Sequence, residues 1–131
     1  MSNSVEAELL TASRQLLDVI DKGDWDAYAK LCDPSISCFE PEALGQLVEG
    51  LPFHKFYFDM PGTGRPKQST MASPMVRVMG DSAAVVTYVR VVQKILADGS
   101  PICASIEETR VWQKKDGRWL HVHFHRSAPG K

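Results

Sequence analysis

The second half of the sequence contains long segments that alternate like β-strands and follow one another with very short connections. The strong segments are residues 83–96, 102–114 and 118–126, and a weaker one precedes them at residues 70–78. Ala97-Asp98-Gly99 and Asp116-Gly117 separate the strong segments, and such residues are typical of tight hairpin turns. The pattern predicts an antiparallel meander, so the chain must fold around one sheet.

The first half has the spacing of amphipathic helices, with apolar residues three and four positions apart. Helices are predicted within residues 3–22, 25–32 and 50–62, and a short strand at residues 36–40. Asp24 is placed to cap the second helix, and Pro52 suits the first turn of the third. Helices followed by a meander predict an α+β fold, in which the helices pack on one face of the sheet.

The charge balance argues against two classes of partner. The 131 residues include 15 Lys and Arg and 16 Asp and Glu, for a formal net charge of −1. Proteins that bind nucleic acid or anionic membranes usually carry a basic surface, so we expect neither partner. No apolar run approaches the roughly 20 residues of a membrane-spanning helix, and no export leader is expected.

Three cysteines, Cys32, Cys38 and Cys103, lack Cys-x-x-Cys spacing, which argues against a disulfide framework or a cysteine-rich zinc site. We expect them to be small apolar core residues of a reduced, cytoplasmic protein. The chain length is that of one domain over residues 1–131.

Each of the three strong strands carries one arginine that alternation allows on the side facing the helices: Arg90, Arg110 and Arg126. Arg126 shares its side of the last strand with Leu120, Val122 and Phe124. A guanidinium removed from water without a partner costs on the order of several kcal/mol. The arginines therefore reach solvent from strand ends, pair with internal carboxylates such as Glu107 or Glu108, or bind an external anion.

The opposite face of the last strand is expected to carry Trp119, His121, His123 and His125. Neutral imidazoles are common zinc or copper ligands, but a closed zinc site needs about three or four ligands and no partner cysteine or acidic cluster is obvious. Aromatic residues and histidines on an outward sheet face are more typical of a protein–protein contact, which we favour. His54, among apolar neighbours, is predicted to be a core histidine.

Three long stretches, KGDWDAYAKLCDP, FEPEALGQLVEGLPFHKFYF and EETRVWQKKDGRWLHVHFHRS, resemble the association (hub) domain of calcium/calmodulin-dependent protein kinase II. The resemblance covers nearly the whole chain and is weakest in the first turn and over residues 61–79. It implies a cone of helices against a strongly curved antiparallel sheet, as in nuclear transport factor 2-like (cystatin-like) proteins.

The same resemblance implies a non-catalytic module that needs no cofactor. Such a domain assembles with itself into two stacked rings, commonly dodecameric or tetradecameric, and gathers kinase domains so that neighbours phosphorylate one another when calmodulin binds. Vertical pairs in these rings meet through the sheet surface, which would give the tryptophan and three histidines of the last strand a partner.

The family also has an internal pocket lined by arginines. The matching positions are Arg90, Arg110 and Arg126, with Tyr28 and His54 at other matched positions and Glu108 as a candidate pocket carboxylate. A guanidinium can bind a carboxylate through two parallel hydrogen bonds. The resemblance therefore implies that the pocket takes a small carboxylate or an acidic peptide, such as a linker or regulatory segment.

The alternative is a small-ligand-binding protein or an enzyme of the isomerase or dehydratase type on the same scaffold. Such an enzyme needs a general base in the cavity, and Glu108, His54 and Tyr28 are the candidates. A carboxylate flanked by arginines has a lowered pKa and is a poor base near neutral pH. We therefore expect an oligomerisation module with no catalytic activity.

Overall fold

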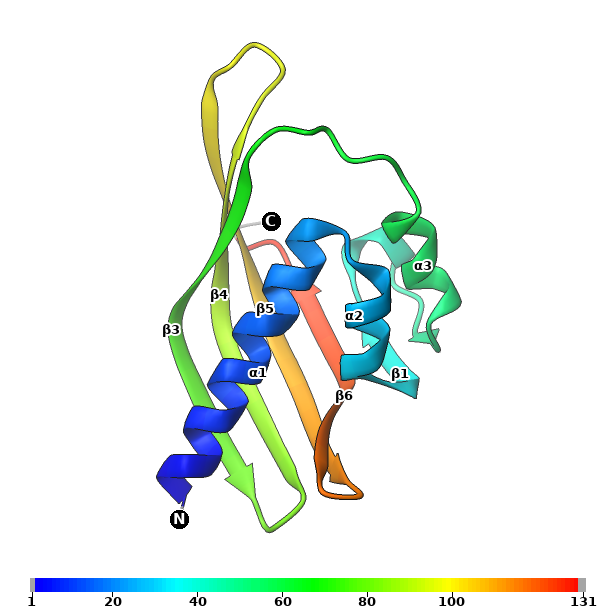
Figure 1. Cartoon of the computed structure of the whole chain (residues 1–131), viewed down its shortest axis with the longest axis vertical. Coiled ribbons are helices and arrows are strands. Elements are labelled where there is room, and N and C mark those ends of the chain that lie inside the picture. Colours follow the sequence, from blue (N-terminus) through cyan, green and yellow to red (C-terminus); the bar gives the residue numbers. More distant parts are fainter. Residues whose placement is uncertain (1, 130–131) are drawn as a thin grey trace.

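The computed structural model describes residues 2–129, and side chains from residue 4 onwards. The helices are α1 (Ser2–Lys22), α2 (Trp25–Leu31) and α3 (Pro52–Phe58), with one 3₁₀ turn, η1 (Pro41–Ala43). The strands are β1 (Cys32–Phe39), β2 (Val48–Glu49), β3 (Lys67–Met79), β4 (Ala83–Ile95), β5 (Pro101–Lys115) and β6 (Arg118–Ser127). Figure 1 shows the helices on one face of a curved sheet, which confirms the predicted α+β class.

The sheet has six strands in the order β2-β1-β6-β5-β4-β3. Strands β3 to β6 form the predicted antiparallel meander, and the β4–β5 hairpin extends beyond the body of the molecule (Figure 1). Strand β1 pairs parallel to β6, which places the first strand beside the last. Residues far apart in the sequence thereby meet in the middle of the sheet.

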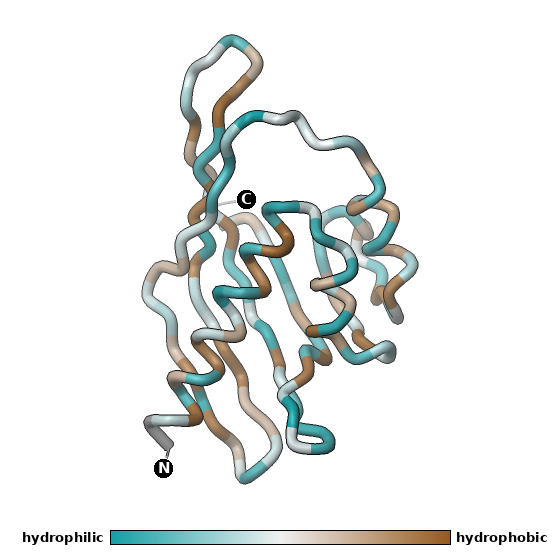
Figure 2. Tube along the Cα trace, viewed as in Figure 1, coloured by the Kyte–Doolittle hydropathy of each residue, from teal (hydrophilic) through white to brown (hydrophobic). Residues whose placement is uncertain are grey.

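Helix α1 lies across the sheet and buries the stripe that its spacing predicts, including Leu9, Leu16 and Leu17. In Figure 2 apolar and polar segments alternate along the helix, as expected for an element with one buried side. Gly23, with φ of +70°, turns the chain into α2, and Asp24 caps that helix by accepting a 3.2 Å hydrogen bond from the Ala27 N–H. Among the described residues, no helix combines the length and apolar character needed to span a membrane.

The core fills the space between the helices and the inner face of the sheet. Its large buried side chains come from every layer: Leu9, Leu16, Tyr28, Ile36, Val86, Trp112 and Phe124. Trp112, in the C-terminal part of β5, is fully buried. Truncating such an aromatic side chain costs about 3–5 kcal/mol, so this side of β5 is fixed by packing.

Several predicted boundaries were wrong. Helix α3 covers Pro52–Phe58 rather than residues 50–62, because Leu51 caps its start and Asp59 its end. Strand β1 begins at Cys32 and so ends α2 one residue earlier than predicted, because Cys32 already pairs with His121 of β6. Strand β3 begins at Lys67, where it pairs along β4. The 3₁₀ turn η1 and the two-residue strand β2 were not predicted, since elements this short leave little periodicity in a sequence.

The prediction that four side chains share the outer face of β6 was wrong for Trp119 and His121. His123 pairs with Val111 and His121 pairs with Trp112, so Val122 lies in a bulge without a partner on β5. A bulge inserts one residue and reverses the alternation beyond it. Trp119 and His121 therefore face the core and are 9% and 0% exposed, whereas His123 and His125 remain on the outer face.

Candidate functional site

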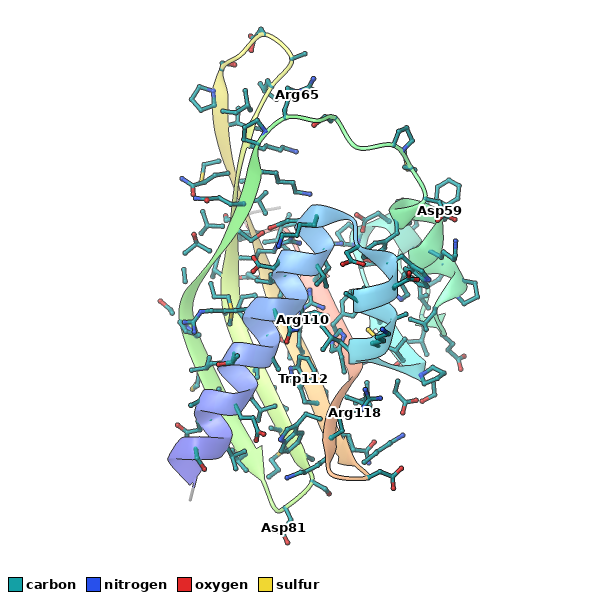
Figure 3. The ribbon with its side chains drawn as sticks, in the orientation of Figure 1. Asp59, Arg65, Asp81, Arg110, Trp112 and Arg118 are labelled. Carbon is teal, nitrogen blue, oxygen red and sulfur yellow. The ribbon has the colours of Figure 1, made fainter. Side chains whose placement is uncertain are left out.

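The three arginines converge on one carboxylate, that of Glu108. The strand register causes this, because Glu108 of β5 lies directly opposite Tyr88 of β4 on one side and Arg126 of β6 on the other. Arg110 follows two residues later on the same face of β5, and Arg90 lies two residues beyond Tyr88. We call Arg90, Arg110, Arg126 and Glu108 the arginine cluster. Figure 3 labels Arg110 and Trp112 on β5, in the region that the helices cover.

Both oxygens of Glu108 have partners. Oε1 accepts hydrogen bonds from the Tyr88 hydroxyl at 2.6 Å and from Arg110 Nη2 at 2.9 Å. Oε2 accepts one from Arg126 Nε at 3.3 Å and lies 3.6 Å from Arg90 Nη1. Arg110 is held further by its Nε, which donates to the Tyr88 hydroxyl at 2.8 Å, and by the Phe124 ring, 4.8 Å away.

Arg90 and Arg126 also bind carboxylates other than Glu108. Arg90 Nη2 donates to Asp21 Oδ1 of α1 at 2.6 Å. Arg126 Nη1 donates to Glu40 Oε1 and Glu42 Oε1, each at 3.0 Å. Each arginine therefore binds at least one internal carboxylate, as buried charges require.

The geometry excludes one of the alternatives open at the sequence level and shows that a second occurs. The side chains of Arg90, Arg110 and Arg126 are 6%, 1% and 15% exposed, so they do not extend from strand ends into solvent. They pair internally, and Glu108 rather than Glu107 is the shared partner, because Glu107 faces the outer side. Arg126 occupies the inner side of β6, which the bulge also gives to His121, because Glu108 is fixed directly across from it.

The electrostatics keep Glu108 ionised. Burial raises its pKa, but the charges of Arg110 and Arg90 and the hydrogen bond from Tyr88 outweigh burial and lower the pKa to about 2. A carboxylate with this pKa holds no proton near neutral pH and is a weak proton acceptor. Glu108 is therefore suited to charge pairing rather than to general-base catalysis.

Tyr28 and His54 lie next to this cluster, on α2 and α3. Both are buried, their ring centroids are 6.1 Å apart, and the His54 ring lies 5.5 Å from that of Phe124. Burial, followed by the charges of Arg110 and Arg126, lowers the pKa of His54 to about 4. Burial also raises the pKa of Tyr28, so both side chains are neutral near neutral pH. His54 is buried, as predicted for a core histidine.

Sequence reasoning missed several partners of the cluster. Tyr88 could have been found, because alternation places it on the same face of its strand as Arg90. Asp21, Glu40 and Glu42 lie in other elements, and nothing local in the sequence links them to the arginines. His121 was assigned to the opposite face, yet its Nε2 lies 3.4 Å from Arg110 Nη1.

The outer face of the sheet has a different character. His123 Nδ1 lies 2.7 Å from Ser37 Oγ, and the half-exposed Phe39 ring contacts His123 and His125. A shallow hollow of about 420 Å³ lies on this face, lined by Thr87, Glu107, Thr109 and His125 among others. Because the bulge separates His121 from the other two histidines, the three-histidine metal set considered from the sequence is not assembled.

A group with mixed metal-ligating side chains lies beside the arginine cluster. Cys38, Glu40 and His54 each offer a donor atom, and these atoms lie within 4.8 Å of one another. Glu40 links this group to the arginine cluster, since its other oxygen accepts a hydrogen bond from Arg126.

Comparison with known proteins places these features in context. Residues 5–130 match the sequence family described as the calcium/calmodulin dependent protein kinase II association domain. The solved CaMKII hub homology domain of Chlamydomonas reinhardtii is 54% identical, with a TM-score of 0.90 over 95% of this chain and 98% of that one. The CaMKII association domain of C. elegans is 42% identical, with a TM-score of 0.92 over 96% and 97% of the two chains.

The fold is shared more widely. A nuclear transport factor 2-like superfamily protein from Salmonella enterica is 25% identical, with a TM-score of 0.80 over 100% of this chain and 95% of that one. This likeness, together with the curved sheet under the helices, confirms the predicted nuclear transport factor 2-like fold.

Proposed function

Because this chain belongs to the calcium/calmodulin-dependent protein kinase II association-domain family, we propose that it is an oligomerisation module that assembles with itself into two stacked rings. The observation that carries the proposal is the family match over residues 5–130. Association domains are non-catalytic modules. The rings are dodecameric, tetradecameric or larger, and residues 1–131 act as a single association domain.

Exposed apolar side chains support assembly. Large hydrophobic residues at the surface include Phe39, Leu44, Leu47, Phe56, Met75 and Met79. Exposed apolar patches are typical of protein–protein contacts, and a net charge of −1 opposes self-association only weakly. We assign the contact between the two rings to the outer face of the sheet around Phe39, His123 and His125. Trp119 and His121 lie on the inner face and affect this contact only indirectly, through the conformation of β6.

In a protein that also carries a kinase domain, such rings gather the kinases so that neighbours phosphorylate one another. Kinase domains and acidic linker peptides are therefore the proposed partners beyond sister copies. A cytoplasmic location agrees with three free cysteines, of which Cys103 is exposed.

We assign the arginine cluster, with Tyr28 and His54, to an anion pocket that receives a small carboxylate or an acidic peptide. Arg126 is the accessible member, and one of its partners, Glu42, is 39% exposed. An incoming carboxylate replaces Glu42 on Arg126 Nη1 and leaves Glu108 in place, because Glu108 is fully buried. The ligand thus exchanges one surface ion pair for another, which costs little.

Two measurements test these proposals separately. Light scattering of the purified chain at micromolar concentration is expected to give a mass many times 14.6 kDa, and a monomer would overturn the assembly. Arg126→Ala is expected to abolish binding of an acidic peptide while the rings stay intact. If the rings dissociate instead, Arg126 is a structural residue and the pocket assignment is wrong.

The competing function, an isomerase or dehydratase of the same fold, requires a general base in the cavity. Glu108, with a pKa of about 2, and His54, with a pKa of about 4 caused by burial and two guanidiniums, are both weak bases. Burial keeps Tyr28 protonated. Turnover of candidate substrates by the purified chain would favour the enzyme over the module.

A further inference from the structure

Three side chains with different donor atoms meet beside the arginine cluster, and we call them the Cys38 cluster: Cys38, Glu40 and His54. Cys38 Sγ lies 3.6 Å from Glu40 Oε2 and 3.9 Å from His54 Nε2. His54 Nδ1 lies 3.8 Å from Glu40 Oε2. Cys38 lies at the end of β1, Glu40 precedes η1 and His54 is in the first turn of α3, so the fold itself brings them together.

The cluster is enclosed. Cys38 is fully buried, and the side chains of His54 and Glu40 are only 5% and 8% exposed. The two oxygens of Glu40 have separate roles, because Oε1 accepts a hydrogen bond from Arg126 and Oε2 faces the thiol and the imidazole. Arg126 thus holds the carboxylate in position, as groups behind metal ligands usually do.

The donor spacing suits a small transition-metal ion. Zinc bonds of about 2.0–2.3 Å in a tetrahedral site place neighbouring donors about 3.5 Å apart. With one donor atom taken from each residue, the three atoms lie within 4.8 Å of one another, so the widest pair closes by at most about 1.3 Å when an ion binds. A sulfur, an imidazole nitrogen and a carboxylate oxygen together are typical of zinc or cobalt and unlike the all-oxygen sites of calcium and magnesium.

We propose that Cys38, Glu40 and His54 form a binding site for a divalent transition-metal ion of the zinc class. The three side chains supply three ligands, and the fourth position of the tetrahedron takes water or an external donor. Binding releases the Cys38 proton to solvent and leaves the ion pair between Glu40 and Arg126 intact.

Cobalt(II) titration of the full, assembled chain tests the site, because cobalt bound to a thiolate gives a charge-transfer absorption that zinc abolishes by displacement. The expected result is one cobalt ion per chain with this band. Cys38→Ser and Cys38→Ala are expected to lack the band, and His54→Gln to bind cobalt at least about tenfold more weakly. Cys103→Ser, which changes an exposed thiol of β5, and Cys32→Ser, which changes the buried thiol beside His121, are the matched controls and are expected to retain the band.

Several outcomes overturn the proposal: no band in the unaltered chain, a band that survives both Cys38 variants, or a band lost in a control. Light scattering of every variant checks that assembly is unchanged, so loss of the band is read only from particles of normal mass. If one Cys38 variant fails to assemble, the other and His54→Gln still decide the result. The metal site and the oligomerisation module can fail independently, since the first is read from the cobalt band and the second from the mass.

Discussion

Glu107 and Glu108 are consecutive glutamates on β5, yet their surroundings have almost nothing in common. Glu108 points inward and is held by Tyr88 and three arginines, whereas Glu107 points outward and lines an open hollow. His121 and His123 of β6 show the same contrast across the bulge, the first fully buried and the second partly exposed. The inner face of the sheet has its charges paired within the chain, while the outer face keeps Glu107 and His125 exposed.

The largest expected effect comes from removing the shared partner on the inner face. Glu108→Gln leaves the buried guanidiniums of Arg110 and Arg90 without their common counter-charge, and the expected loss is about 3–5 kcal/mol in the free energy of unfolding. Denaturant unfolding at fixed protein concentration measures it. Glu107→Gln is the matched control and is expected to change stability by less than about 0.5 kcal/mol. Equal losses of stability in the two variants would contradict the view that only the inner-face glutamate is held by buried charges.

Lowering the pH is expected to reduce the stability of the protein through buried groups on the inner face of the sheet. Burial and the arginine charges lower the pKa of His54 from 6.5 to about 4, so unfolding takes up a proton in this range and stability falls as the pH drops from 6.5 to 4. The shift corresponds to a loss of about 3 kcal/mol from His54. Glu108, whose pKa is lowered to about 2, adds a further loss below pH 4.5.

Unfolding measured from pH 8 to pH 4 checks this dependence. His54→Gln is expected to show a shallower decline than the unaltered chain. Part of the decline persists, because burial and the charge of Arg110 also lower the pKa of His121. Identical slopes for the two proteins would show that His54 does not carry the effect.

On the outer face, His125→Glu tests assembly without touching the core. A carboxylate in place of an exposed imidazole beside Phe39 adds a charge to the proposed contact between copies. We expect at least about tenfold weaker assembly, equivalent to about 1.4 kcal/mol, and unchanged secondary structure. Sedimentation across a concentration series measures the change, with Asp81→Asn in the exposed β3–β4 turn as the control. An unaltered dissociation curve would place the contact elsewhere.

The smallest expected effect tests the bulge. Trp119 faces inward and its Nε1 donates to Glu8 Oε1 of α1 at 3.2 Å. Trp119→Phe removes this hydrogen bond and part of a buried ring, and we expect a loss of about 1 kcal/mol in stability with normal assembly. If the variant assembles poorly but has normal stability, Trp119 takes part in contacts between copies and its placement on the inner face is wrong.

Much of the fold could be predicted from the sequence, because long strands and amphipathic helices leave strong periodic signals. The three helices, the meander and the family resemblance are all confirmed. The bulge at Val122 could not be predicted, since strict alternation over residues 118–126 gives no sign of an extra residue. The arginines could be singled out by parity, but their partners Asp21, Glu40 and Glu42 are brought to them only by tertiary packing.

The central claim is that a sheet with paired charges inside presents its outer face to sister copies. Electron micrographs of the purified chain test it most directly, by showing whether particles are built of many subunits. We predict closed rings in two stacked layers that meet through the sheets. Isolated subunits, or open chains of copies that leave the sheets bare, would contradict the account.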